Sequence, residues 1–85
     1  MKNLALQTAQ NNITVNNIAV GTIYTDRNAE VLKDEIYHQA VIDSIPMKRI
    51  GQVEDCVGTV LMLASDAGKY ITGENIHVDG GKNIL

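Results

Sequence analysis

The sequence predicts an α/β fold in which helices connect two parallel strands of a larger sheet. Two stretches indicate the strands: the uncharged, β-branched ITVNNIAV at 13–20 and the short apolar alternation NIHVD at 75–79. The segments between them have apolar residues at helical spacing. Strands connected in this way pair in parallel with a right-handed crossover. The predicted helices are too few to cover both faces of the sheet. The fold is therefore expected to be incomplete on its own.

The first predicted element is a helix that is already in progress at the first residue. One face of it is formed by Met1, Leu4, Ala5 and Thr8. No Ser, Thr or Asp precedes this face as an N-terminal cap. The helix is expected to end near Asn11–Asn12, and a buried strand follows at 13–20.

Residues 26–45 form the second helical segment. Its apolar positions at helical spacing are Val31, Leu32, Ile36, Ala40 and Val41. The pattern weakens at Lys33 and Asp34, which leaves either one helix or two short ones. Pro46 ends the segment, because proline cannot continue a helix, and the loop KRIGQ follows.

The third helical segment covers residues 52–66. A stripe is formed by Val53, Val57, Val60, Leu61 and Ala64, and is widened by Cys56 and Leu63. A stripe of this width is typical of a helix that is buried on two sides. The turn-rich stretch AGKYITGE then leads to the strand 75–79, in which Ile76 and Val78 face the same way.

Composition and charge exclude several classes of protein. A chain of 85 residues has room for one small unit, so 1–85 is predicted to be a single partial domain. The net charge is −3 and the basic residues are scattered singly, which gives no stripe that could bind nucleic acid. No apolar run approaches a membrane span, and we expect a cytoplasmic protein without membrane contact.

The sequence offers no metal site. Its single cysteine excludes an intrachain disulfide, and with only two histidines the ligands of a Cys/His zinc site are too few. Cys56 is predicted to be an inert, small core residue. His38 and His77 are predicted to have surface or packing roles.

Three stretches in fixed order resemble one known family. ITVNNIAVGTIYTDRN, IPMKRIGQVEDC and LASDAGKYITGENIHVDGG are similar to the last third of a short-chain dehydrogenase/reductase. The resemblance covers essentially the whole chain. It implies the C-terminal part of a Rossmann-type, doubly wound parallel sheet. The likeness is greatest to sugar and polyol dehydrogenases, such as glucose or gluconate dehydrogenase, and to 3-oxoacyl-acyl-carrier-protein reductases.

The turn after the first strand is the predicted cofactor contact. Open α/β sheets bind ligands outside the carboxyl ends of their strands, where Gly21 lies. The resemblance implies that four residues contact NAD or NADP, Ile23 through its main chain and Thr25 through its hydroxyl: Gly21, Thr22, Ile23 and Thr25. The alternative is that they form only a strand-to-loop turn. The family usually has proline where this chain has Val20, so a looser turn is expected.

The family's catalytic and phosphate-binding residues are not found in these 85 residues. The glycines lack the spacing that holds a pyrophosphate at a helix N-terminus. The family's chemistry needs a tyrosine four residues before a lysine, but Tyr24, Tyr37 and Tyr70 have no such partner. Lys2 lies beyond the position of the family's lysine. We therefore expect no catalytic residue in this chain and no cofactor bound by it alone.

Two hypotheses for function follow. The chain is either the C-terminal portion of an NAD(P)-dependent oxidoreductase, inactive alone, or a non-catalytic oligomerisation or interaction module derived from that fold. In both, a homo-oligomer through helix 52–66 and strand 75–79 is expected. The segment Asp26–Pro46 would cover substrate in the family and is expected to be poorly protected here. Asp55 and Asp66 are predicted to solvate helix ends, and Asp79-Gly80-Gly81 to form a structural turn.

Overall fold

Two short parallel strands form the centre of the molecule in the computed structural model, which describes all of residues 1–85. The two strands are paired in register from Asn17 opposite Asn75 to Val20 opposite Val78. Four 3₁₀ turns supplement the helices and strands. The main elements in chain order are α1 (Lys2–Thr8), β1 (Asn17–Val20), α2 (Glu35–Asp43), α3 (Glu54–Ala64) and β2 (Asn75–Val78). The predicted α/β class, parallel pairing and element order are confirmed.

β1 is shorter and less buried than the predicted strand at 13–20. It begins only at Asn17, because the preceding residues bind the loop before β2 through irregular contacts. The Val15 N–H donates to Thr72 Oγ1 at 3.1 Å, and the Val15 carbonyl accepts from the Gly73 N–H at 2.8 Å. A side chain thus replaces part of the regular ladder there. The ends of β1 are exposed, so the prediction of a buried strand is wrong for this chain.

The first helix has the predicted ends. α1 has no side-chain cap at Met1 and continues as a 3₁₀ turn over Ala9–Asn11. Asn12 then adopts the left-handed conformation, with φ of 59°, which stops the helix. Ala5 is the buried residue of this element.

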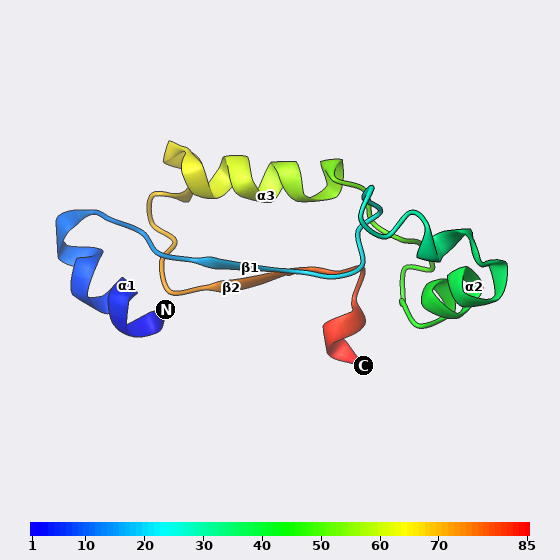
Figure 1. Cartoon of the computed structure of the whole chain (residues 1–85). Coiled ribbons are helices and arrows are strands. Elements are labelled where there is room, and N and C mark those ends of the chain that lie inside the picture. Colours follow the sequence, from blue (N-terminus) through cyan, green and yellow to red (C-terminus); the bar gives the residue numbers. More distant parts are fainter.

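The segment 26–45 forms two short elements, the second of the two predicted alternatives. A 3₁₀ turn covers Val31–Lys33, and α2 begins at Glu35. Asp34 separates them, because its carboxylate accepts the N–H groups of Ile36 and Tyr37 at 3.0 and 3.2 Å and so caps α2. α2 lies beyond the carboxyl ends of the strands, away from α3 (Figure 1).

α3 lies along one face of the sheet (Figure 1), but it presents a different set of residues inward from the predicted stripe. The half-buried residues of α3 are Cys56, Thr59, Met62 and Leu63. The predicted stripe is exposed to solvent, with Val57 at 46%, Val60 at 50% and Leu61 at 62%. The prediction that the stripe is buried is therefore wrong for this chain. The reason is that α3 has apolar residues on two faces, and one sheet can cover only one of them.

The molecule is extended. Its radius of gyration is 15.9 Å, whereas a compact chain of this length has about 12 Å. No helix covers the second face of the sheet, since α1 lies beyond the amino ends of the strands and the C-terminal turn beyond their carboxyl ends (Figure 1). The buried residues are few and scattered: Ala5, Leu32, Ile45, Ile50 and Gly68. None of the helices combines the length and apolar character needed to cross a bilayer.

Candidate functional site

Gly21 begins the turn at the carboxyl end of β1. Its N–H donates to the Val78 carbonyl at 3.0 Å, so the turn starts directly beside the end of β2. A Cβ atom at Gly21 would lie 2.6 Å from the Asp79 Cβ and 2.8 Å from the Asp79 Cα. Only glycine allows the two chains to approach this closely.

The next three residues run extended beside the loop that precedes α3. The Gly51 N–H donates to the Thr22 carbonyl at 2.9 Å, and the Tyr24 N–H donates to the Gly51 carbonyl at 2.8 Å. Successive peptide groups of an extended chain face opposite ways, so the N–H and C=O of Ile23 both face away from Gly51. The Ile23 carbonyl accepts from Asn28 Nδ2 at 2.7 Å. The Ile23 N–H has no acceptor within the chain.

Asn28 is a residue of this site that the sequence analysis missed. Its Oδ1 accepts the Thr25 N–H at 2.9 Å and lies 3.5 Å from Thr25 Oγ1, as acceptor of the hydroxyl. One side-chain amide therefore binds both Ile23 and Thr25. Asparagine side chains often bind the backbone of a nearby turn, so an Asn three residues after Thr25 was the available signal.

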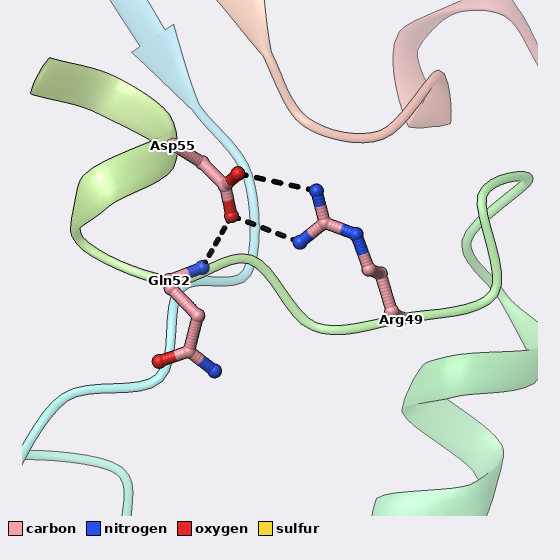
Figure 2. Close-up of polar contacts among 3 residues, drawn as sticks. All are labelled: Arg49, Gln52 and Asp55. Carbon is pink, nitrogen blue, oxygen red and sulfur yellow. Dashed lines mark hydrogen bonds and ion pairs between the residues drawn. The ribbon is translucent and has the colours of Figure 1, made fainter.

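Arg49, Gln52 and Asp55 form a polar cluster that fixes the loop before α3 (Figure 2). The Arg49 guanidinium donates to the Asp55 carboxylate through its two terminal nitrogens, Nη1 and Nη2, at 2.9 and 3.1 Å. The same carboxylate accepts the Gln52 N–H at 2.7 Å, just before α3 begins. Asp55 is thus more than the solvated helix-end residue that the sequence analysis predicted.

The charge of Asp55 is stabilised by these contacts. Hydrogen bonds from Arg49, followed by that from the Gln52 N–H, lower the pKa of the Asp55 carboxyl from 3.8 to about 2. The carboxylate in turn raises the pKa of Arg49. Because Gln52 follows Gly51 directly, the cluster helps to hold the backbone that pairs with Thr22 and Tyr24.

A pocket of about 380 Å³ opens beside this turn, outside the carboxyl ends of both strands. Thr22 and Ile23 line it, together with the pair Arg49 and Asp55. Gly21 and Thr25 belong to the same turn but do not line the pocket. This is the place where open α/β sheets bind their ligands.

The predicted structural turn at 79–81 is confirmed. Asp79 accepts the Gly81 N–H through Oδ1 at 3.0 Å and the Asn83 N–H through Oδ2 at 3.1 Å. Gly80 and Gly81 have positive φ angles of 66° and 94°. Asp79 thus holds a turn whose residues line the pocket. The structure contains no group of three or more His, Cys, Asp or Glu side chains that could hold a metal ion.

A loop that meets a pocket at the carboxyl ends of parallel strands defines the class: a Rossmann-type α/β fold. The family model described as enoyl-(acyl carrier protein) reductase matches residues 1–83. The chain belongs to this family, the short-chain dehydrogenases/reductases. The resemblance seen in the sequence is therefore confirmed.

Relatives and solved structures agree with this assignment. The 3-oxoacyl-(acyl-carrier-protein) reductase FabG of Staphylococcus aureus N315 is 46% identical over 80 residues, which are 94% of this chain and 32% of the relative. A structure described as a 2-deoxy-D-gluconate 3-dehydrogenase from Agrobacterium tumefaciens with bound NADP has a TM-score of 0.91 and 36% identity, covering 99% of this chain and 34% of that one. The structure of 4-hydroxyisoleucine dehydrogenase complexed with NADH has a TM-score of 0.93 and 28% identity, covering 99% and 35%.

The chain spans about a third of the length of these relatives. Its homologues are oxidoreductases that use a nicotinamide cofactor, and NADP or NADH is bound in the two structures just described.

Proposed function

We propose that this chain is the C-terminal portion of an NAD(P)-dependent short-chain oxidoreductase and that its turn 21–25 binds the nicotinamide end of the cofactor. The observation that supports this most directly is the Ile23 N–H, a donor without an acceptor at the carboxyl end of β1. In the same turn the Thr22 carbonyl, the Tyr24 N–H, the Ile23 carbonyl and the Thr25 N–H are all engaged in hydrogen bonds.

The residues present suit a nicotinamide carboxamide. That group has one carbonyl acceptor and one NH₂ donor, so it needs a donor and an acceptor side by side. The Ile23 N–H is the donor. The Thr25 hydroxyl and the second lone pair of the Ile23 carbonyl are the acceptors, and Gly21 lets the backbone approach closely. The bound cofactor would supply the hydride chemistry, while these residues would bind and orient its ring.

The proposed substrates are the carbonyl or alcohol groups of sugars, polyols or 3-oxoacyl thioesters. The names of the relatives, a 3-oxoacyl-(acyl-carrier-protein) reductase and a 2-deoxy-D-gluconate 3-dehydrogenase, support the oxoacyl and sugar-derived classes, and the resemblance seen in the sequence adds polyols. A cytoplasmic location is part of the same proposal.

The chain alone is proposed to be inactive and to bind no cofactor on its own. None of its tyrosines precedes a lysine by four residues, and its glycines do not form a phosphate-binding turn. A nicotinamide absorbance assay with sugars, polyols and oxoacyl thioesters tests this. Turnover by the chain that is abolished in Thr25→Ala would contradict the inactivity.

A chimera tests the proposed role of the turn itself. Residues 1–85 would replace the corresponding third of the S. aureus FabG, which supplies the rest of the fold. We expect the chimera to bind NADPH and to lose affinity about tenfold in Thr25→Ala, the effect of one hydrogen bond. A folded chimera that binds no cofactor would overturn the proposal.

A non-catalytic assembly module is the second candidate function. The exposed apolar stripe of α3 favours it, since monomers rarely leave such a surface uncovered. The coding sequence just upstream of Met1 distinguishes the two. An in-frame Tyr-x-x-x-Lys would support the enzyme, and a clean intergenic region the module.

A further inference from the structure

We infer that Asn28 is a positioning residue for the nicotinamide carboxamide: its amide fixes the Ile23 carbonyl and the Thr25 hydroxyl in the orientation that the cofactor needs. The inference rests on the proposed function of the turn 21–25. Nothing in the family match or in the names of the relatives assigns this role.

The Asn28 side chain makes three hydrogen bonds to Ile23 and Thr25, a set called the Asn28 staple below. Asn28 Nδ2 donates to the Ile23 carbonyl at 2.7 Å, while Oδ1 accepts from the Thr25 N–H at 2.9 Å and from the Thr25 hydroxyl at 3.5 Å. The Asn28 N–H also donates to the Thr25 carbonyl at 3.2 Å, which closes the turn. Both the donor and the acceptor of one side chain are used, so the segment 23–25 has one favoured arrangement.

The staple determines which groups remain for a ligand. The Thr25 hydroxyl lies 3.5 Å from Asn28 Oδ1, and donation to that acceptor leaves the lone pairs of the hydroxyl oxygen free to accept. The Ile23 C=O is held on the side opposite Gly51, and the Ile23 N–H faces the same side with no acceptor. The turn therefore presents the Ile23 N–H donor beside the Ile23 carbonyl and Thr25 hydroxyl acceptors before any ligand arrives.

Holding the binding groups of Ile23 and Thr25 in place raises the affinity for cofactor more in this turn than it would in a rigid one. Val20 leaves the backbone angle φ free before the turn, where a proline ring would fix it. Groups that are already oriented lose less conformational entropy when they bind, and the gain appears as affinity. Asn28 is half-buried, which limits competition from water for its bonds.

A purely structural role is the competing explanation, and Asn16 provides a matched control for it. Its Nδ2 donates to the Ile71 carbonyl at 3.0 Å, and its Oδ1 accepts the Glu74 N–H at 3.0 Å. Asn16 is also half-buried, but it lies just before β1, at the opposite end from the pocket. Asn16→Asp and Asn28→Asp therefore remove the same kind of donor, the first just before β1 and the second in the turn that follows β1.

The first experiment measures amide hydrogen exchange in the 85-residue chain by NMR. We expect the Thr25 N–H to be protected in the wild type and in Asn28→Asp, which keeps the acceptor, and to lose protection in Asn28→Ala. Asn16→Asp is expected to leave it unchanged. A Thr25 N–H that exchanges at the rate of an unfolded chain in the wild type would overturn the staple.

The second experiment titrates the FabG chimera with NADPH, whose reduced ring is uncharged and so is not attracted by an added carboxylate. We expect the dissociation constant to rise about tenfold in Asn28→Asp and at least as much in Asn28→Ala, with Asn16→Asp within twofold of the wild type.

The outcomes separate the two claims. Equal effects of Asn28→Asp and Asn16→Asp would show that Asn28 only stabilises the fold and would overturn the inference. Unchanged affinity in both Asn28 variants would overturn it as well. A wild-type chimera that folds but does not bind NADPH would instead reject the proposed function of the turn.

Discussion

At the scale of single residues, Gly21 and Gly58 differ in whether a larger side chain would fit: there is no room for one at Gly21, and there is room at Gly58. A Cβ atom at Gly21 would meet backbone and side-chain atoms of Asp79 within 3 Å, whereas one at Gly58 in α3 would meet nothing within 4 Å. Gly21 therefore serves close packing of the strand ends. Gly58 only weakens its helix.

The two alanine variants should change stability in opposite directions. Gly21→Ala is expected to lower the free energy of unfolding by about 1–3 kcal/mol, because the backbone must move to admit the methyl group. Gly58→Ala is expected to raise it by about 0.5–1 kcal/mol through helix propensity. Urea denaturation followed by circular dichroism measures both. Equal stability of the two variants would show that the strand ends do not meet as described.

The cluster of Asp55 predicts a pH dependence with a definite sign. The pKa of this carboxyl is lowered from 3.8 to about 2 in the folded chain, so its contribution to stability is complete above pH 4. That contribution is lost as the pH falls from about 4 to 2. A carboxyl carbon NMR titration of the wild type should give a midpoint near 2.

Arg49→Lys tests the cause of this shift. A lysine cannot form the two-nitrogen contact of Arg49, so the Asp55 midpoint should move back toward 3.8 without reaching it, since the Gln52 N–H bond remains. An unchanged midpoint in Arg49→Lys would show that Arg49 does not stabilise the Asp55 charge.

The sequence predicted part of this site and missed the rest for a physical reason. The turn after β1 follows from a strand that ends in glycine, and the family resemblance named Thr22 and Ile23, which line the pocket. Asn28 and the Arg49–Asp55 pair act through hydrogen bonds whose existence depends on how the loops fold back. Sequence spacing alone does not determine such contacts, although an asparagine in a turn is a usable signal.

At the scale of elements, helix positions were predictable and the inward face of α3 was not. Apolar spacing located the helix within 52–66 because periodicity is a local property. α3 has apolar residues on two sides, and which side meets the sheet depends on the rest of the fold. Cys56 and Leu63, predicted only to widen the stripe, are among the half-buried residues of α3. β1 is shorter than predicted because the Val15 N–H bonds the Thr72 side chain and the Asn16 side chain bonds the Ile71 carbonyl, in place of its first ladder bonds.

α2 is the element expected to be least protected. It has no buried residue of its own, Ile36 is 86% exposed, and it packs chiefly on the 3₁₀ turn Val31–Lys33. Elements with few buried apolar contacts open at low free energy. Hydrogen exchange should therefore show faster exchange of α2 amides than of β1 and β2. Strong protection throughout Asp26–Pro46 in a demonstrated monomer would contradict this.

At the scale of the whole molecule, too much surface is exposed for a chain of this size. The accessible surface is 6312 Å², whereas a compact protein of 9.2 kDa exposes about 4,900 Å². The difference exceeds the surface that each partner buries in a standard protein interface, about 800 Å². The parallel sheet also has one uncovered face and an unpaired strand edge, and association with another chain would cover both.

Self-association through α3 and β2 is the expected consequence, and it can be separated from non-specific stickiness. The stripe Val53, Val57, Val60, Leu61 and Ala64 lies on one side of α3 and is open to solvent. Leu61 is 62% exposed within this stripe, whereas Ile36 is 86% exposed on α2, outside it. A symmetric dimer would bury the stripe against its copy, and a charge at Leu61 would then be buried in an apolar interface. Sedimentation velocity across a range of concentrations should show association of the wild type and of Ile36→Glu, but a monomer for Leu61→Glu.

Equal loss of association in both variants would indicate general hydrophobic aggregation. A stable, well-folded wild-type monomer at low micromolar concentration would contradict self-association altogether.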